Sequence, residues 1–277
     1  MKRVLFLFSF ILASVFFISA QTYDEWIDKS FKYIESKDWA EAEKALIEAL
    51  RSQPANPQNA LLLSNLGTIQ RKMGKNEEAL KSYSNALMIT PRSVTLLMNR
   101  AALLSEMDKV DDALKDYNQV LVLDDKEEDA LYLRGLIRLE KNDTIASRKD
   151  FEQLLKINPK SSNARIGLAA LMKSRNYYNE AIDLYTQVIR VNPEQATLYL
   201  NRGEAYLLNN RLNKADEDVA KALELDSNDP LAYVLRAKIK LVRYEKEDAK
   251  RDLDKAVSLG FDRKDADFLL NNEQSKK

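Results

Sequence analysis

The chain has 277 residues, in which 43 Lys and Arg balance 43 Asp and Glu, and it contains neither Cys nor His. The balanced charge provides no overall field that would attract nucleic acid. Without Cys and His, the sequence excludes disulfides, thiolate nucleophiles and the commonest general base and metal ligand.

The first twenty residues have the layout of a secretory signal peptide. A short basic start is followed by a mostly apolar run, residues 4–18, and then by small residues. We predict that residues 1–20 are removed by cleavage between Ala20 and Gln21 and that the protein is exported, with the periplasm as its expected compartment. Secretion to the medium is one alternative. An uncleaved membrane anchor is another, although about 15 apolar residues fall short of the roughly 20 that span a bilayer as a helix.

The rest of the chain repeats with a period of 34 residues. Small residues recur at Ala79, Ala113, Ser147, Ala181, Ala215 and Ala249. Four places after each stands a large apolar residue: Tyr83, Tyr117, Phe151, Tyr185, Val219 and Leu253. Twelve places before each stands a second small residue: Gly67, Ala101, Gly135, Ala169, Gly203 and Ala237. Each period therefore predicts two amphipathic helices that approach closely through their small residues.

These residues resemble the tetratricopeptide repeat, whose pattern sets small and aromatic residues at fixed places and ends in Pro. The first unit supplies Trp26, Tyr33, Ala42, Leu46, Ala49 and Pro54, and the sixth supplies Tyr199, Gly203, Tyr206, Ala215 and Ala222. Seven units are predicted, at residues 23–56, 60–93, 94–127, 128–161, 162–195, 196–229 and 230–263. The resemblance implies an all-α, right-handed superhelical solenoid of about seven antiparallel helix pairs.

The end of the array is predicted from its departures from this pattern. Lys240 replaces the ring or apolar residue of other units, and we expect it on the exposed outer face of a terminal repeat. Residues 264–277 are predicted as a capping helix and a tail, with Phe268, Leu269 and Leu270 covering the last helix pair.

The resemblance also implies that the first helices line a concave groove in which related proteins bind peptides or partner proteins. Asn65, Asn99 and Asn201 share the sixth place of their units. An Asn amide has a donor and an acceptor, so it suits the backbone of an extended peptide. We predict these three residues as part of a partner-binding groove, with a solvated polar face as the alternative interpretation.

Three basic residues near this stripe complete the predicted groove: Arg71, Lys72 and Lys173. Their charge suits a carboxylate of the ligand. Similar domains hold acidic chaperone tails with a clamp of five Lys, Asn and Arg residues. Only Asn65 and Asn99 match that clamp here, and we therefore do not expect it.

Acidic runs are the remaining candidates for a metal site or a catalytic carboxylate pair. Residues 124–129 and 226–229 both fall where one unit ends and the next begins, and acidic residues favour a helix N-terminus. Neither run has the Gly or the ligand spacing of a calcium loop, and the Gly residues form no phosphate loop. No catalytic, metal-binding or cofactor-binding residue is predicted, and an enzyme with an unrecognised carboxylate site is the remote alternative.

A turn in the fourth unit carries a modification motif. Asn142-Asp143-Thr144 is an N-glycosylation sequon, and Asp143-Thr144-Ile145 is similar to a short O-glycosylation motif of exported bacterial proteins. Thr144 is therefore a candidate for glycosylation.

The sequence as a whole predicts an exported scaffold that binds a protein or peptide in the concave groove. It predicts no nucleic-acid partner, no cofactor and no membrane span after signal cleavage. The structural alternative is a subunit whose array ends stack into a homo-oligomer or an envelope complex.

Overall fold

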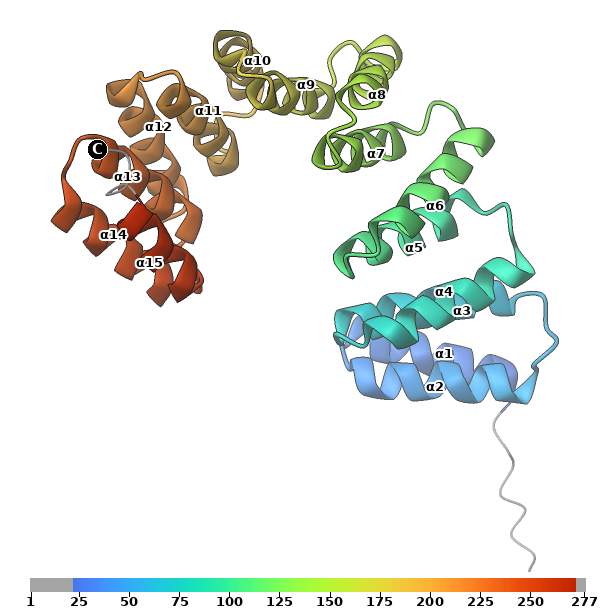
Figure 1. The fold of residues 1–277 in the computed structure, drawn as a ribbon. Helices are drawn as coiled ribbons and strands as arrows, with labels where there is room; N and C mark the ends of the chain where they lie inside the picture. The colour runs from blue at the N-terminus through green and yellow to red at the C-terminus, as the bar shows by residue number, and fades with distance from the viewer. Residues whose placement is uncertain (1–21, 273–277) are drawn as a thin grey trace, which may run out of the picture. The chain divides into compact units, whose positions relative to one another are not determined.

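The computed structural model describes residues 22–272, which form fifteen α-helices and no strand (Figure 1). The helices are α1 (Tyr23–Glu35), α2 (Trp39–Ser52), α3 (Asn59–Lys72), α4 (Asn76–Ile89), α5 (Val94–Glu106), α6 (Val110–Leu123), α7 (Glu128–Glu140), α8 (Thr144–Ile157), α9 (Ser162–Ser174), α10 (Tyr178–Val191), α11 (Ala196–Leu208), α12 (Leu212–Leu225), α13 (Pro230–Val242), α14 (Lys246–Ser258) and α15 (Arg263–Asn272). The predicted all-α fold is confirmed for this part of the chain. The predicted signal segment, with Ala20 and Gln21, lies outside the described residues.

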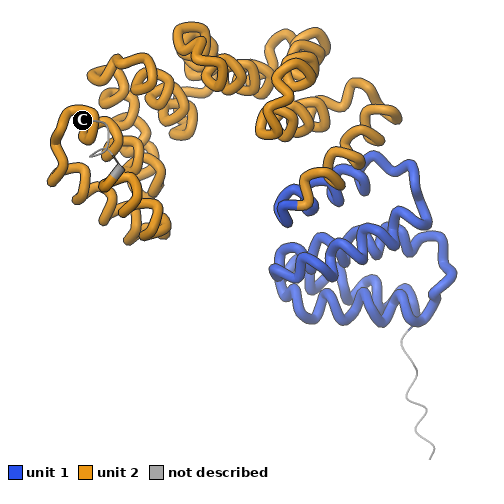
Figure 2. Tube along the Cα trace, in the orientation of Figure 1, with its two compact units in different colours: residues 1–108 blue, residues 109–277 orange. Residues whose placement is uncertain are grey.

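The chain divides into two compact units, which Figure 2 colours separately. Unit 1 ends at Asp108 and contains α1 to α5, and unit 2 begins at Lys109 and contains α6 to α15. Within unit 1, α1 packs on α2 and α3 on α4. Within unit 2, the pairs are α7 with α8, α9 with α10, α11 with α12 and α13 with α14, and α15 packs on α14.

The turn after the first helix of each pair contains one residue in the left-handed region of backbone conformation. In the first pair this residue is Lys37, and from the second pair onward the residues are spaced 34 apart: Gly74, Asp108, Asn142, Asn176, Asn210 and Tyr244. Gly, Asn and Asp adopt this conformation at little cost. Tyr244 adopts it with φ 65° and a bulky side chain that is 84% exposed. The period of the sequence is therefore also a period of turn geometry.

The start of the array is fixed by a capping box. The backbone N–H of Glu25 donates to Thr22 Oγ1 at 3.3 Å, and the backbone N–H of Thr22 donates to Glu25 Oε2 at 2.8 Å. These two bonds satisfy N–H groups that a helix N-terminus otherwise leaves without partners.

The small residues allow helices to approach a buried ring. Phe151 of α8 is fully buried, and its Cδ1–Cε1–Cζ edge lies against both Gly135 of α7 and Gly167 of α9. The hydroxyl of Ser147, which stands where other units have Ala, donates to the carbonyl oxygen of Gly135 at 2.8 Å. The first helices also contact one another in consecutive pairs, as α3 does with α5, α7 with α9 and α11 with α13. We call these helices the first-helix layer.

Buried ion pairs cross the helix pairs of unit 2 at a constant spacing of 16 residues. Arg134 pairs with Asp150, Arg202 with Asp218 and Arg236 with Asp252, each through two hydrogen bonds of 2.6–3.0 Å. Each of the three Asp residues is no more than 5% exposed. Because the guanidinium is bidentate, each pair fixes both the spacing and the orientation of the two helices.

Two expectations about the end of the array are wrong. Lys240 does not lie on an exposed outer face, because its Nζ donates to Asp252 Oδ2 at 2.7 Å and its side chain is only 23% exposed. Phe268 does not cover the last pair, because it is 66% exposed. The buried side of α15 is instead formed by Ala266, with Leu269 and Leu270 partly buried beside it, at the three- and four-residue spacing of one helix face.

None of the helices described between residues 22 and 272 combines the length and the apolar character needed to cross a membrane.

Candidate functional site

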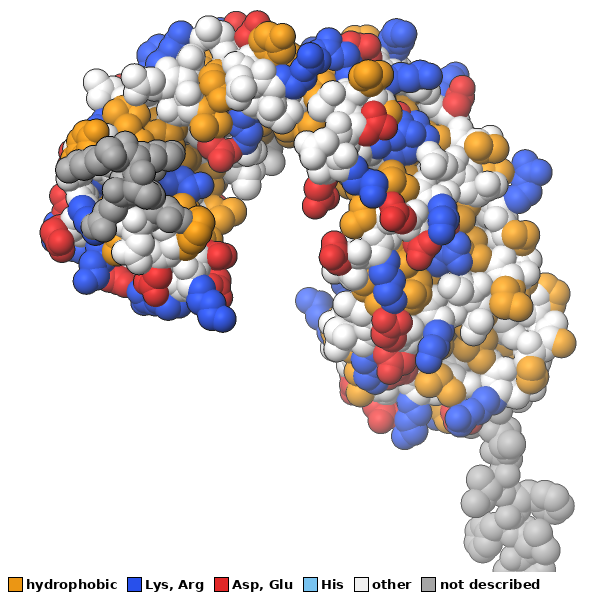
Figure 3. Space-filling view, viewed as in Figure 1, with side chains coloured by type: hydrophobic (Ala, Val, Ile, Leu, Met, Phe, Trp, Pro, Cys, Tyr) orange, Lys and Arg blue, Asp and Glu red, His pale blue; other side chains and the backbone are white. Residues whose placement is uncertain are grey.

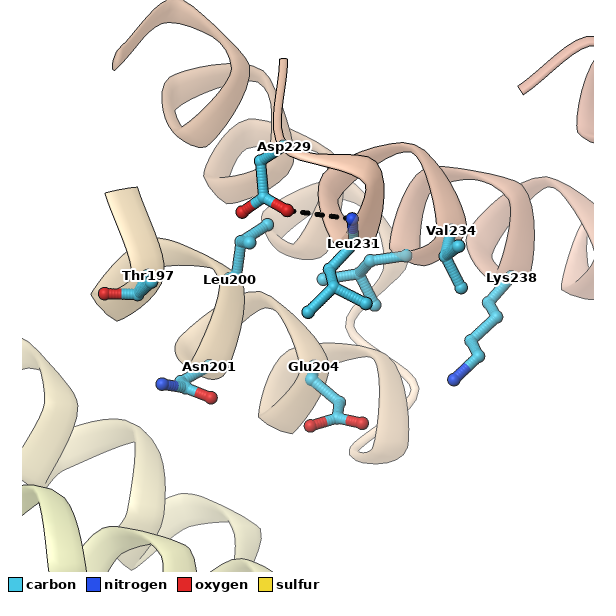
Figure 4. Close-up of a pocket in the computed structure, with 9 residues that line it drawn as sticks. Thr197, Leu200, Asn201, Glu204, Asp229, Leu231, Val234 and Lys238 are labelled. Atoms are coloured by element: carbon cyan, nitrogen blue, oxygen red, sulfur yellow. Dashed lines mark hydrogen bonds between the residues drawn. The ribbon is translucent and has the colours of Figure 1, made fainter. Parts of the chain in front are cut away.

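A cleft of about 210 Å³ opens in the first-helix layer of unit 2, between α11 and α13 (Figure 4). Thr197, Leu200, Asn201 and Glu204 line it from α11, and Asp229, Leu231, Val234, Leu235 and Lys238 line it from the start and the body of α13. Its floor is apolar, since Leu200, Val234 and Leu235 are buried. Its rim is polar apart from Leu231, which is 57% exposed.

The repeat itself builds this cleft. The four lining residues of α11 and the four within α13 occupy the same places in their units, one period of 34 residues apart. Spacings of three and four residues keep each set on one face of its helix. The start of α13 is fixed by Asp229, whose Oδ1 accepts from the backbone N–H of Leu231 at 2.8 Å, and by Pro230 in the first turn.

The charges around the cleft are unevenly paired. Glu204 is hydrogen-bonded to Lys173 of α9, so its charge is already balanced. Burial, and secondarily the negative charge of Glu204, raises the pKa of the neighbouring Tyr185 above its usual range. By contrast, Lys238 and Asn201 have no ion pair or hydrogen bond from their side chains to any residue in the described part of the chain.

The predicted groove residues of unit 1 lie on neighbouring helices. Asn65 on α3 and Asn99 on α5 are both half-buried, and within residues 22–272 neither side chain is hydrogen-bonded. Arg71 pairs with Glu106 of α5, and this hydrogen bond raises the pKa of Arg71. Lys72 is exposed, with its Nζ 5.5 Å from the centroid of the Trp39 ring.

The arrangement differs in two respects from the sequence-based picture of the groove. Arg71 and Lys173 already have carboxylate partners within the chain, so they are less available to a ligand than their sequence positions indicate. Lys238 and Leu231 were not singled out, although both stand in the same periodic stripe as Asn201. The second and ninth places of the units share no single residue type, so the period alone gives no signal for these two residues.

The acidic runs and the glycosylation motif are the remaining candidate sites from the sequence. Asp124 and Asp226 each accept a hydrogen bond from the backbone N–H two residues later, at 3.0 Å, which shapes the turns between units. The described residues contain no cluster of three acidic side chains that would suit a metal ion. Thr144 is the first residue of α8 and is partly exposed, and the adjacent Ile145 is 84% exposed.

Charges of both signs are interspersed on the face of the molecule drawn in Figure 3, where Lys and Arg side chains alternate with Asp and Glu. This pattern accords with the balanced composition of the chain.

Models of one repeat family match three parts of the sequence. A model described as TPR repeat matches residues 171–210, and models described as tetratricopeptide repeat match residues 128–161 and 196–229 and residues 33–94. The comparison with curated proteins gives no match.

Solved structures extend this relationship along the chain. A tetratricopeptide repeat protein from Parabacteroides merdae ATCC 43184 is 38% identical with a TM-score of 0.84, and the alignment covers 92% of this chain and 100% of that one. A thermophilic TPR protein of Thermus thermophilus is 19% identical with a TM-score of 0.59, over 66% of this chain and 100% of that one. PilF of Pseudomonas aeruginosa is 17% identical with a TM-score of 0.61, over 78% and 97% of the two chains.

The last two likenesses concern the fold alone, whereas the first joins sequence and structure over nearly the whole array. Proteins built from these repeats generally serve as scaffolds for protein interactions, and the fold is typically not an enzyme. From the 38% identity over the full length of the Parabacteroides protein, together with the matches to the repeat models, we conclude that the chain belongs to the tetratricopeptide repeat family.

Proposed function

We propose that this protein is an exported scaffold that binds a protein or peptide segment along its first-helix layer. The observation that carries the proposal is the cleft between α11 and α13, which combines an apolar floor with an amide and an ammonium group that have no partner within residues 22–272. An apolar surface supplies most of the binding free energy, while a few polar groups set the orientation of the ligand.

Affinity capture from an envelope extract of the native host tests this proposal. The bait is the chain without residues 1–20, compared with a cleft variant, Asn201→Ala/Leu231→Asp, and with a unit 1 variant, Asn65→Ala/Asn99→Ala. A partner held by the wild type and lost by the cleft variant supports the site, and mass spectrometry identifies it. Loss of the partner with the unit 1 variant alone would place the binding site on α3 and α5. Equal retention of the partner by all three proteins would place the site outside the first-helix layer.

Export is the second part of the proposal. It is supported by the basic, apolar and small-residue layout of residues 1–20 and by the position of Thr22, which remains in the chain as the cap of α1 after cleavage at Ala20. The intact mass of the protein from the periplasmic fraction of the native host tests it. A mass that begins at Gln21 agrees with a cleaved signal, and a mass that includes residues 1–20 in the membrane fraction favours an anchor.

Self-assembly through the end of the array is the alternative function. It rests on the exposure of Phe268, which places a large apolar side chain on the surface of α15. Sedimentation of the wild type and of Phe268→Glu at high micromolar concentration separates the two functions. An oligomer that the substitution dissociates supports assembly, and a monomer in both cases counts against it.

A further inference from the structure

The cleft between α11 and α13 has a size and a charge that restrict its ligand. At about 210 Å³ it is smaller than the roughly 300–1,000 Å³ of sites for small molecules, so it fits one or two side chains of a longer segment. Its buried floor consists of Leu200, Val234 and Leu235, which suits an aliphatic side chain. Leu231 at the rim is 57% exposed, so a bound ligand would remove more of its apolar surface from water.

Three charged side chains line the cleft, and two of them already have partners. Glu204 is balanced by Lys173, and the Asp229 carboxylate accepts from the N-terminus of α13, where a negative charge is stabilised by the helix dipole. Lys238 has no such partner among the described residues. The ligand group that complements it is a carboxylate.

The spacing along α13 sets the spacing within the ligand. Lys238 follows Val234 by four residues, and a helix rises by about 1.5 Å per residue, so the two side chains are offset by about 6 Å along the axis. In an extended peptide, side chains two residues apart point to the same side at about 6.6–6.8 Å. In a segment that runs along α13, an aliphatic side chain over Val234 therefore places the side chain two residues away beside Lys238.

We propose that the cleft binds an internal, extended peptide segment in which an aliphatic residue and an Asp or Glu stand two residues apart. The aliphatic side chain occupies the floor, the carboxylate pairs with Lys238, and the amide of Asn201, on the facing helix α11, bonds to the peptide backbone. This inference rests on the proposed function and adds the chemical class of the ligand.

Selection from a heptapeptide library displayed on phage tests the pattern. The peptides are displayed without a free C-terminus, so a terminal carboxylate cannot replace the acidic side chain. The full chain without residues 1–20 is compared with Lys238→Glu and with Lys250→Glu, a matched charge reversal at an exposed position of α14 outside the cleft. Circular dichroism melts establish that all three proteins are folded.

The wild type and Lys250→Glu are expected to select peptides with an aliphatic residue two places from Asp or Glu. Lys238→Glu is expected to select Lys or Arg at the acidic place. A synthetic peptide of the selected sequence should bind Lys238→Glu at least about tenfold more weakly than the wild type, and replacement of its acidic residue by the neutral amide should abolish that difference.

Three results would overturn the inference. The first is a set of selected peptides that lose binding to Asn201→Ala/Leu231→Asp but show no preference for Asp or Glu. This result leaves the proposed function intact and refutes the proposed ligand class. If the synthetic peptide binds with a free C-terminal carboxylate but not with an amidated C-terminus, the meaning is the same. If no selected peptide is sensitive to Asn201→Ala/Leu231→Asp, both the ligand class and the proposed site in this cleft are wrong.

Discussion

Substitution of Gly167 by Ala should destabilise the array, although Ala is ordinarily the better helix residue. A Cβ atom at Gly167 would lie 2.6 Å from both Cδ1 and Cζ of Phe151 and closer still to Cε1. Carbon atoms pack favourably at about 3.5–4.0 Å, so the overlap is about 1 Å. The ring has no room to withdraw towards α7, because the same edge already lies so close to Gly135 that even a Cβ atom built there would be 2.5 Å from it.

The magnitude follows from two opposing effects. Replacing Gly by Ala in a helix gains about 1 kcal/mol. Overpacking a rigid, buried site costs about 1–3 kcal/mol, and the severe overlap at Gly167 places its cost in the upper part of this range, at about 2–3 kcal/mol. We expect Gly167→Ala to lower the free energy of unfolding by about 1–2 kcal/mol, which corresponds to a fall in Tm of about 2–8 °C for a chain of this size.

Gly203→Ala is the matched control, because a Cβ there would lie 3.3 Å from Asp218 Cβ and 3.4 Å from Leu235 Cδ2. These neighbours need to move only slightly, and we expect this variant to be neutral or more stable than the wild type. Urea melts of Gly167→Ala in the wild type and in a Phe151→Leu background measure the coupling. The cost of Gly167→Ala should shrink when the ring is removed. If Gly167→Ala melted at or above the wild type, as Gly203→Ala does, the close packing of Phe151 between two helices would be refuted.

Further predictions concern packing, acid stability and modification. Gly135→Trp and Ala181→Phe should each cost about 1–3 kcal/mol or more in urea melts, because both sites are buried between helices, and wild-type stability in both would refute the packing register. Burial alone would raise the pKa of Asp252, but hydrogen bonds from its two basic neighbours outweigh this effect and hold the pKa below its usual range. Its ion pairs therefore stabilise the fold above a pH of about 4 and lose this effect as the pH falls through the lowered folded-state pKa. Asp252→Asn should cost roughly 1–3 kcal/mol at pH 7 and much less well below pH 4, so a deficit independent of pH would contradict this assignment. Glycosylation at Thr144 predicts added hexose mass on protein from the native host, and an unmodified intact mass would exclude it.

The fold could be predicted from the sequence because one signal recurs many times. Each period repeats small and large apolar residues at fixed places, and a departure at a single position does not change the spacing. The residues at the ends are different, since they depend on a single local arrangement. Phe268 was expected to be buried because it is apolar, but the face of α15 that packs on α14 is set by Ala266 and its neighbours three and four residues on.

Polar positions were harder to interpret than apolar ones. Lys240 is expected to be exposed, yet it pairs with the buried carboxylate of Asp252, twelve residues away on the facing helix. The Arg and Asp residues spaced by 16 also recur along the sequence, but the pattern of small and large apolar residues does not include them. For the candidate site, the sequence identified Asn201 but not Lys238, because availability for a ligand depends on which charges are already paired. The limits of the repeats and the role of the three Asn residues stay predictions.

Hydrogen–deuterium exchange of the protein with and without its captured partner tests the central claim most directly. Binding in the cleft predicts added protection of backbone amides in α11 and α13, residues 196–208 and 230–242, with little change in α12 and α14. Protection confined to α10, α12 and α14, without any in the first helices, would contradict binding along the first-helix layer.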